Sequence, residues 1–209
     1  LRRQSPYATY FKKAVGIKDS PRAKVLVLKK GELKLIWISV DLIAAEPQFI
    51  DYIMEHAKDL GVSRDRIFLS ASHTHSGPGA FTKSKFWQIM AVDKYNPQLF
   101  KHMAEKILEA VKKANANLAP AVIATEEIQI DNVTVNRRRS NHLDPVAALI
   151  RLDRVDGTPI AMAFNFPIHG TVQGIRNLHI SGDVTSAIER NIERTTGAIG
   201  IFLNGAEGD

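Results

Sequence analysis

The chain has 209 residues, with 28 lysines and arginines against 22 aspartates and glutamates, so its formal net charge is +6. Hydrophobic residues make up 44% and charged residues 24%, which is typical of a globular domain and excludes a disordered or fibrous protein. The absence of cysteine excludes a disulfide framework, zinc–thiolate sites and a cysteine nucleophile. No apolar stretch is long enough to span a bilayer, and the first residues do not form a signal peptide.

The positive charge lies almost entirely at the N-terminal end. Residues 1–34 carry ten basic and two acidic side chains, a net of +8, whereas the other 175 residues have a net of −2. A basic arm can bind nucleic acid or a membrane surface. Aromatic residues are few and no nucleic-acid-binding signature is present, so we expect no nucleic-acid partner. We interpret the segment as solvated chain with lysines flanking strands, and peripheral membrane contact stays open as the alternative.

The first half of the chain predicts a hairpin, a helix, a strand and a longer helix. Branched apolar runs at 25–28 and 33–40 predict two strands joined by a short turn. A helix is expected from Pro47 to Leu60, because proline favours a first helical position and Gly61 follows the end. A strand at 67–71 and a helix at 97–114, with Asn96 as its N-cap, complete this half.

The second half alternates in the same way. Strands are expected at 122–130, 146–152 and 160–166, with the last two joined as a hairpin across Asp156 and Gly157. A helix at 183–194, preceded by Ser181 and closed by Gly197, leads to a buried strand at 199–203. The order of elements predicts an α/β fold, a mixed β-sheet with flanking helices, in a single domain covering residues 1–209.

Polar, glycine-rich segments follow three of these strands, where α/β proteins commonly form their sites. The first contains His73 and His75, which point the same way if the backbone is extended. Two imidazoles can then face one metal, or one can bind metal while the other contacts substrate. His169 follows the second strand and is a plausible third imidazole, and residues 204–209 follow the third. Solvated loop histidines, or a histidine at the rim of the core, are the alternatives.

Other polar residues near these segments are weaker candidates. The run Asn136–Ser140 contains three arginines, of which one or two can bind an anion or stabilise an oxyanion. Asp183 is either a carboxylate that orients a metal ligand or an acid favoured by a helix N-terminus. For Asp41, a role in a helix cap or turn and a role as a carboxylate of the site are both compatible with the sequence. For His179 we favour a capping or surface role.

The string Ala71–Gly79, which reads ASHTHSGPG, resembles the signature of the neutral/alkaline non-lysosomal ceramidase family. Three further stretches agree in order: Asn136-Arg137, the segment 164–171 with its His-Gly-Thr, and 202–209, which ends in Gly-Asp. The resemblance implies a zinc-dependent amidohydrolase that cleaves the N-acyl bond of ceramide, a lipid amide. It implies His73 and His169 as zinc ligands, His75 as a catalytic residue near the metal, and Arg137 as a contact of substrate or transition state.

The resemblance also implies that further functional residues lie beyond Asp209: a serine close by, and a glutamate and a tyrosine that complete the zinc site. We therefore expect the chain to be truncated at both ends, and to bind zinc weakly and have little activity alone. Another amide or ester substrate, or a non-catalytic binding role, stays open. A secreted and a cytoplasmic location are both compatible with the sequence.

Overall fold

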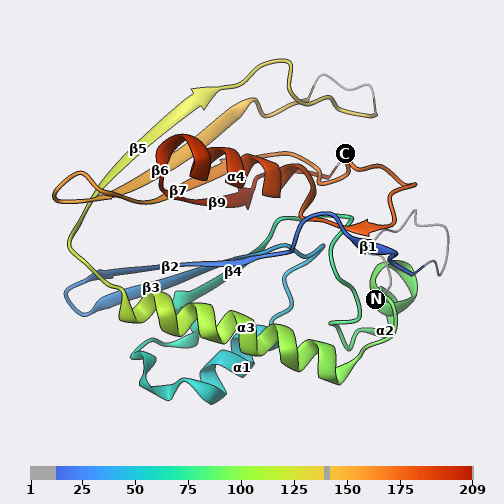
Figure 1. The fold of residues 1–209 in the computed structure, drawn as a ribbon, viewed down its shortest axis with the longest axis horizontal. Coiled ribbons are helices and arrows are strands. Elements are labelled where there is room, and N and C mark those ends of the chain that lie inside the picture. The colour runs from blue at the N-terminus through green and yellow to red at the C-terminus, as the bar shows by residue number, and fades with distance from the viewer. Residues whose placement is uncertain (1–12, 139–141, 209) are drawn as a thin grey trace.

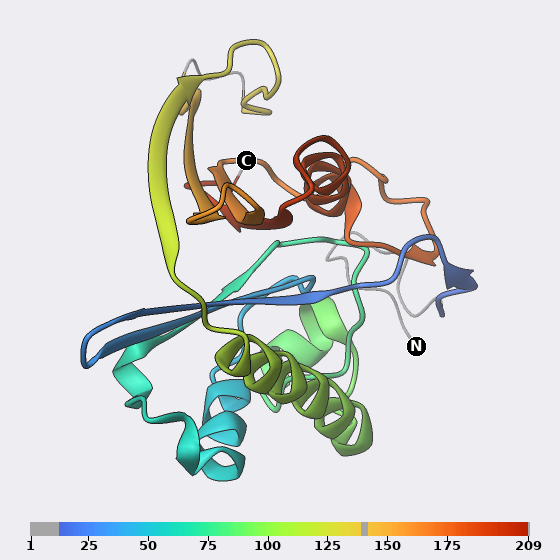
Figure 2. The ribbon, with the colours of Figure 1, turned by 60° about the vertical axis from the view of Figure 1, so that its left-hand side comes forward.

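The computed structural model describes residues 13–138 and 142–208 and arranges them in four layers (Figure 1). Helices α1 (Gln48–His56) and α3 (Pro97–Ala116) cover a three-stranded sheet. This sheet packs face to face on a four-stranded sheet, whose outer face carries helix α4 (Asp183–Thr196). Figure 2 shows the same order of layers after a turn about the vertical axis.

Both sheets combine parallel and antiparallel strands. The three-stranded sheet has the order β2 (Ala23–Lys30), β3 (Leu33–Val40) and β4 (Ile67–Ala71). The four-stranded sheet has the order β5 (Ala121–Gln129), β6 (Val146–Arg154), β7 (Pro159–Phe166) and β9 (Ile199–Asn204). The pairs β3–β4 and β7–β9 are parallel and the others antiparallel. The expected α/β class with mixed pairing and flanking helices is confirmed, and the strands expected from the sequence divide between these two sheets.

Successive side chains along a strand point to opposite faces of its sheet and so pack into different hydrophobic clusters. On β2, Val27 packs with the helices α1 and α3, whereas Leu26 packs against the other sheet. On β9, Ile201 faces the three-stranded sheet and Phe202 joins the cluster that contains Ile188 of α4. Both faces of these strands are therefore apolar, which explains why they read in the sequence as continuous apolar runs.

The first helix is shorter than expected. Helix α1 ends at His56, because Ala57 leaves the helical region at φ −145° and ψ 58°. A 3₁₀ turn, η1 (Lys58–Leu60), follows and is closed by Gly61 in the left-handed conformation at φ 62°. The expectation of one continuous helix to Leu60 is therefore wrong in its last turn. Leu60 is nevertheless buried, so the apolar pattern was read correctly.

The start of α3 and the close of α4 follow the sequence. The Asn96 side chain accepts hydrogen bonds from two backbone N–H groups in the first turn of α3, and Gly197 closes α4 at φ 73°. The expected cap of α4 by Ser181 is wrong by one position: Gly182 is the N-cap and makes no side-chain capping bond, although the Ser181 hydroxyl accepts the N–H of Asp183. These positions are fixed by local hydrogen bonding and by the freedom of glycine at positive φ.

Several short elements have no counterpart in the sequence prediction, because they are too short to show a period. They are β1 (Gly16–Ile17), η2 (Arg64–Arg66), α2 (Lys85–Trp87), the π-helical turn η3 (Gln88–Val92) and β8 (His179–Ile180), which pairs with β1 in parallel. Within the described residues, none of the helices is long and apolar enough to cross a membrane.

Part of the N-terminal positive charge is used inside the fold. Lys24 is only 7% exposed and lies 3.2 Å from Glu189 of α4, and it also pairs with Glu193. Arg22 contacts the same two glutamates, at 3.1 and 2.9 Å. The interpretation of this segment as solvated chain is therefore wrong for these two residues, because α4 brings acidic partners to β2. Residues 1–12 of the basic arm lie outside the described range.

Candidate metal centre

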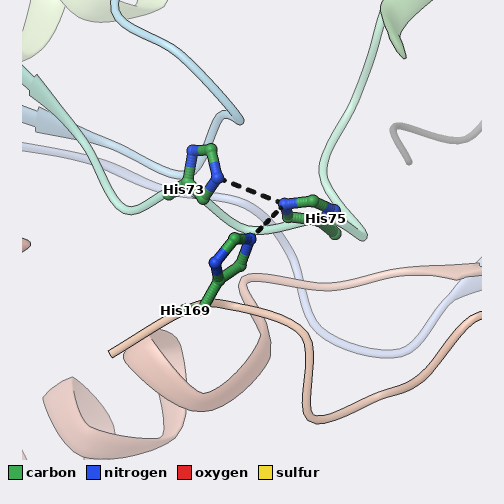
Figure 3. A group of neighbouring side chains, drawn as sticks. All are labelled: His73, His75 and His169. Carbon is green, nitrogen blue, oxygen red and sulfur yellow. Dashed lines mark hydrogen bonds between the residues drawn. The ribbon is translucent and has the colours of Figure 1, made fainter. Parts of the chain in front are cut away.

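Three histidines from two different loops meet at one end of the two-sheet sandwich (Figure 3). His73 and His75 lie in the loop that follows β4, and His169 lies in the loop that follows β7. Because β4 and β7 belong to different sheets, the site bridges the interface between them. The position at the carboxyl ends of the strands agrees with the sequence prediction.

The local backbone at His73 is not the extended conformation in which His73 and His75 would point the same way by alternation. His73 has φ 54°, in the left-handed region that residues other than glycine rarely occupy. Its Nδ1 lies 2.6 Å from the carbonyl oxygen of Ile43, so Nδ1–H donates and the lone pair of Nε2 is left for another partner. The turn therefore sets the orientation of the His73 imidazole, and the alternation of side chains along an extended strand does not explain it.

The three Nε2 atoms point toward one another. The His73 and His75 Nε2 atoms are 3.2 Å apart, and the His75 and His169 Nε2 atoms are 2.8 Å apart (Figure 3). Two nitrogen ligands about 2.0–2.1 Å from a tetrahedral zinc ion lie about 3.3 Å from each other. The first distance fits that value and the second is somewhat shorter. The residues present therefore fit a zinc ion with three imidazole donors.

The two loops are held together by contacts that leave no room for larger side chains. The His75 N–H donates to the Gly170 carbonyl oxygen at 2.9 Å. A Cβ atom added to Gly170 would lie 2.7 Å from the His73 carbonyl oxygen and 2.9 Å from Thr74 Cα. Thr74 is itself buried and donates to the Ser181 carbonyl oxygen. Glycine at position 170 thus permits the close approach that brings the imidazoles together.

The electrostatics keep His75 neutral. Burial, together with the nearby charges of His73, His169 and Arg137, lowers the pKa of His75 to about 3. Its Nδ1 is buried with no hydrogen-bond partner among the described residues. A neutral imidazole is the form that binds metal or that accepts a proton from a substrate group.

Glu207 is the site residue that the sequence analysis did not single out. Its Oε2 lies 3.1 Å from His169 Nδ1 and its Oε1 lies 3.6 Å from His73 Nε2. A carboxylate beside Nδ1 favours a proton on that nitrogen, so that the lone pair of His169 Nε2 points toward the other two histidines. Burial raises the pKa of Glu207, opposed by the charges of His73 and Arg137. The only sequence signal was its place in the polar segment after the last strand.

The histidines open onto a cavity of about 1140 Å³. Its walls include the predicted residue Arg137, whose Nη2 lies 3.5 Å from His169 Nδ1, and Glu207. The remaining walls are largely apolar and include Ile43, Phe81, Trp87 and Val92. The structure thus brings His73, His75, His169 and Arg137 to one cavity that combines donors for a metal, a cation and an apolar surface.

The weaker candidates lie outside this cavity. Asp41 is buried beneath the first loop, where it accepts hydrogen bonds from the Arg22 N–H and the Ser72 hydroxyl. Burial raises the pKa of Asp41 despite these bonds. Asp183 is also buried, with a raised pKa for the same reason, and accepts the backbone N–H of Gln173. Both carboxylates hold loops in place, and His179 is exposed on β8 as we favoured.

Asp19 joins the N-terminal segment to the start of α4. Its carboxylate accepts hydrogen bonds from the Ser181 hydroxyl and the Gly182 N–H, and it lies 3.4 Å from Arg190. Burial raises the pKa of Asp19, but these hydrogen bonds and the Arg190 charge together outweigh burial and hold it below its usual value.

The chain matches a known protein family over most of its length. The family model for the N-terminal part of the neutral/alkaline non-lysosomal ceramidases matches residues 5–199, and the chain belongs to this family. A neutral ceramidase of Mycobacterium tuberculosis is 26% identical over 212 residues, which cover 91% of this chain and 33% of that protein. Neutral ceramidase A of Dictyostelium discoideum is also 26% identical, over 81% of this chain and 26% of that protein.

Solved structures agree with the fold. The crystal structure of the neutral ceramidase of Pseudomonas aeruginosa superposes with a TM-score of 0.86 at 21% identity, covering 99% of this chain and 36% of that one. A ceramidase structure described as complexed with C2 gives the same TM-score. The chain therefore spans about a quarter to a third of the length of these relatives.

Proposed function

We propose that this chain forms the metal-binding part of a zinc-dependent hydrolase that cleaves an N-acyl amide bond, with ceramide as the substrate class. The observation that carries the proposal is the convergence of the His73, His75 and His169 Nε2 atoms at the wall of a cavity that also contains Arg137. Family membership supports the hydrolase class, because the curated relatives are named neutral ceramidases.

His73 and His169 would hold the zinc ion, and His75 would either complete the ligand set or contact the substrate. Bound zinc supplies Lewis-acid polarisation of a carbonyl and lowers the pKa of water. The Arg137 guanidinium would stabilise negative charge that develops on the carbonyl oxygen. Glu207, whose pKa burial raises, would accept the proton that the attacking water loses. The apolar walls would exclude bulk water and strengthen each of these interactions.

Metal analysis tests the site directly. Zinc bound per chain is measured by elemental analysis after equilibrium dialysis against buffer that contains zinc, so that weak binding is also detected, for the wild type and for His73→Ala and His169→Ala. The matched control is His102→Ala, because His102 is exposed on α3, away from the cavity. We expect zinc in the wild type and the control and its loss in the two site variants. Equal zinc in all four proteins would contradict the proposed ligands.

The substrate class is tested separately. The zinc-loaded protein, in the longest form that its coding sequence provides, is assayed with a panel of N-acylsphingosines and short N-acyl amides. Turnover of N-acylsphingosines that is lost in Arg137→Gln would support the ceramidase proposal. Turnover of the short amides alone would favour a different acyl substrate. Zinc binding without any turnover would favour a non-catalytic binding role.

A further inference from the structure

A cluster of exposed apolar side chains lies beside the mouth of the metal-site cavity. The helical turns α2 and η3 expose four large apolar residues, at 60%, 52%, 80% and 50% of their surfaces for Phe86, Trp87, Ile89 and Met90. Such side chains rarely gather on a surface that faces only water. Trp87 also lines the cavity with His73 and His169, so the cluster and the metal site are continuous.

Positive charge surrounds this cluster. Lys83, Lys85 and Lys94 are all exposed, and Asp93 is the only acidic residue between positions 83 and 95. Lysine side chains bordering exposed aromatic and aliphatic residues are typical of segments that lie at a membrane interface. The lysines can contact anionic headgroups while the apolar side chains enter the acyl region.

The rest of the molecule holds this segment in a fixed position. Phe81 and Val92, at its two ends, are each 2% exposed and belong to the core of the three-stranded sheet. The Asn96 N–H donates to the Ala80 carbonyl oxygen, and the Gln88 side chain donates to the Thr82 carbonyl oxygen. The apolar side chains are thus presented from a supported turn, so little ordering entropy opposes their insertion.

We infer that residues 83–95 form a docking surface for an anionic lipid bilayer. Phe86, Trp87, Ile89 and Met90 enter the interface, and Lys83, Lys85 and Lys94 contact the headgroups. Because Trp87 lies on the cavity wall, docking brings the cavity mouth against the bilayer. This geometry would deliver a lipid amide from the membrane to the histidines, an inference that rests on the proposed function. Binding to the bilayer is independent of the proposed function.

Tryptophan fluorescence measures the docking. The chain has two tryptophans, and Trp37 packs in the core between the sheets, so Trp37→Phe leaves Trp87 as the reporter. Vesicles of phosphatidylcholine with phosphatidylglycerol are titrated into this protein, and vesicles of phosphatidylcholine alone serve as the comparison. We expect a blue shift of the Trp87 emission that saturates with the anionic vesicles and that high salt weakens.

Two pairs of variants separate specific docking from general charge or apolarity. In the Trp37→Phe background, Lys83→Gln with Lys85→Gln should weaken partitioning about thirtyfold, because each lysine at an anionic surface contributes roughly fivefold. Lys29→Gln with Lys30→Gln, at the exposed β2–β3 turn, should change it little. Ile89→Ser should weaken it about tenfold or more. Ile123→Ser on β5 is its control, because Ile123 is 54% exposed but distant in sequence from the segment.

Three outcomes would overturn the inference. The first is no shift of the Trp87 emission with anionic vesicles, and the second is equal weakening by the Lys29 and Lys30 control. The third is an oligomer that Ile89→Ser dissociates while vesicle binding is unchanged, which would identify the cluster as a protein interface. Since the titration needs neither metal nor turnover, failure of the proposed hydrolase activity would leave its result unaffected.

Discussion

Replacing Glu207 with glutamine should weaken zinc binding by roughly ten- to a hundredfold. The substitution keeps the size of the side chain and removes its charge. In the structure one carboxylate oxygen lies 3.1 Å from His169 Nδ1 and the other 3.6 Å from His73 Nε2. The Glu207 side chain is 15% exposed, so solvent screens these interactions only partly.

The magnitude follows from the role of the carboxylate. A carboxylate behind a metal-binding histidine fixes its tautomer and raises its basicity, and loss of that partner costs about 1.4 to 2.7 kcal/mol of binding free energy. Glutamine can still accept a hydrogen bond but carries no charge, so the effect should fall within this range. A loss well beyond a hundredfold would instead indicate that Glu207 binds the metal itself, which the 3.6 Å separation from His73 Nε2 also permits.

The assay is a competition titration in which a chromophoric chelator and the protein compete for zinc. Glu46→Gln is the matched control, because Glu46 lines the same cavity and makes no ion pair with the three histidines within the described part of the chain. Circular dichroism confirms that each variant is folded. If Glu207→Gln binds zinc as tightly as the wild type, or if Glu46→Gln weakens zinc binding equally, Glu207 does not support zinc binding through His169.

Three further changes test the framework around the site. Gly170→Ala should lower the unfolding free energy by about 1–3 kcal/mol and weaken zinc binding, since the added methyl separates the loop of His169 from the loop of His73 and His75. Denaturant titration measures the change in unfolding free energy. Gly208→Ala is the control, because its added Cβ meets nothing within 4 Å. Asp19→Asn should cost about 1 kcal/mol at neutral pH. Because the folded pKa of Asp19 is depressed, that cost should be present above the ordinary aspartate pKa of 3.8. It should be lost as the pH falls through the lower folded pKa. If the wild type and Asp19→Asn differ in unfolding free energy by the same amount in strong acid, this reasoning is wrong. Asn96→Ala should lower the thermal unfolding midpoint by removing about 1 kcal/mol of cap stabilisation, and an unchanged midpoint would show that the cap is dispensable.

Much of the fold was predictable because it depends on local patterns. The strand at 33–40, the helix that begins after Asn96 and the close of the last helix at Gly197 all depend on alternation, capping and positive φ. The last turn of the first helix was not predictable, since the change at Ala57 leaves the apolar pattern intact. The short helical turns at residues 85–92 could not be predicted either, because a segment of a few residues shows no measurable hydrophobic period.

The sequence by itself determined the class of the chain, its family resemblance and the three imidazoles that carry the metal hypothesis. Only the tertiary structure decided that His75 and His169, 94 residues apart, place their Nε2 atoms 2.8 Å from each other. It also decided that Glu207 stands behind His169 and that Lys24 is paired inside the fold. Capping and alternation act between neighbours in the chain, whereas these contacts depend on how two separate sheets pack.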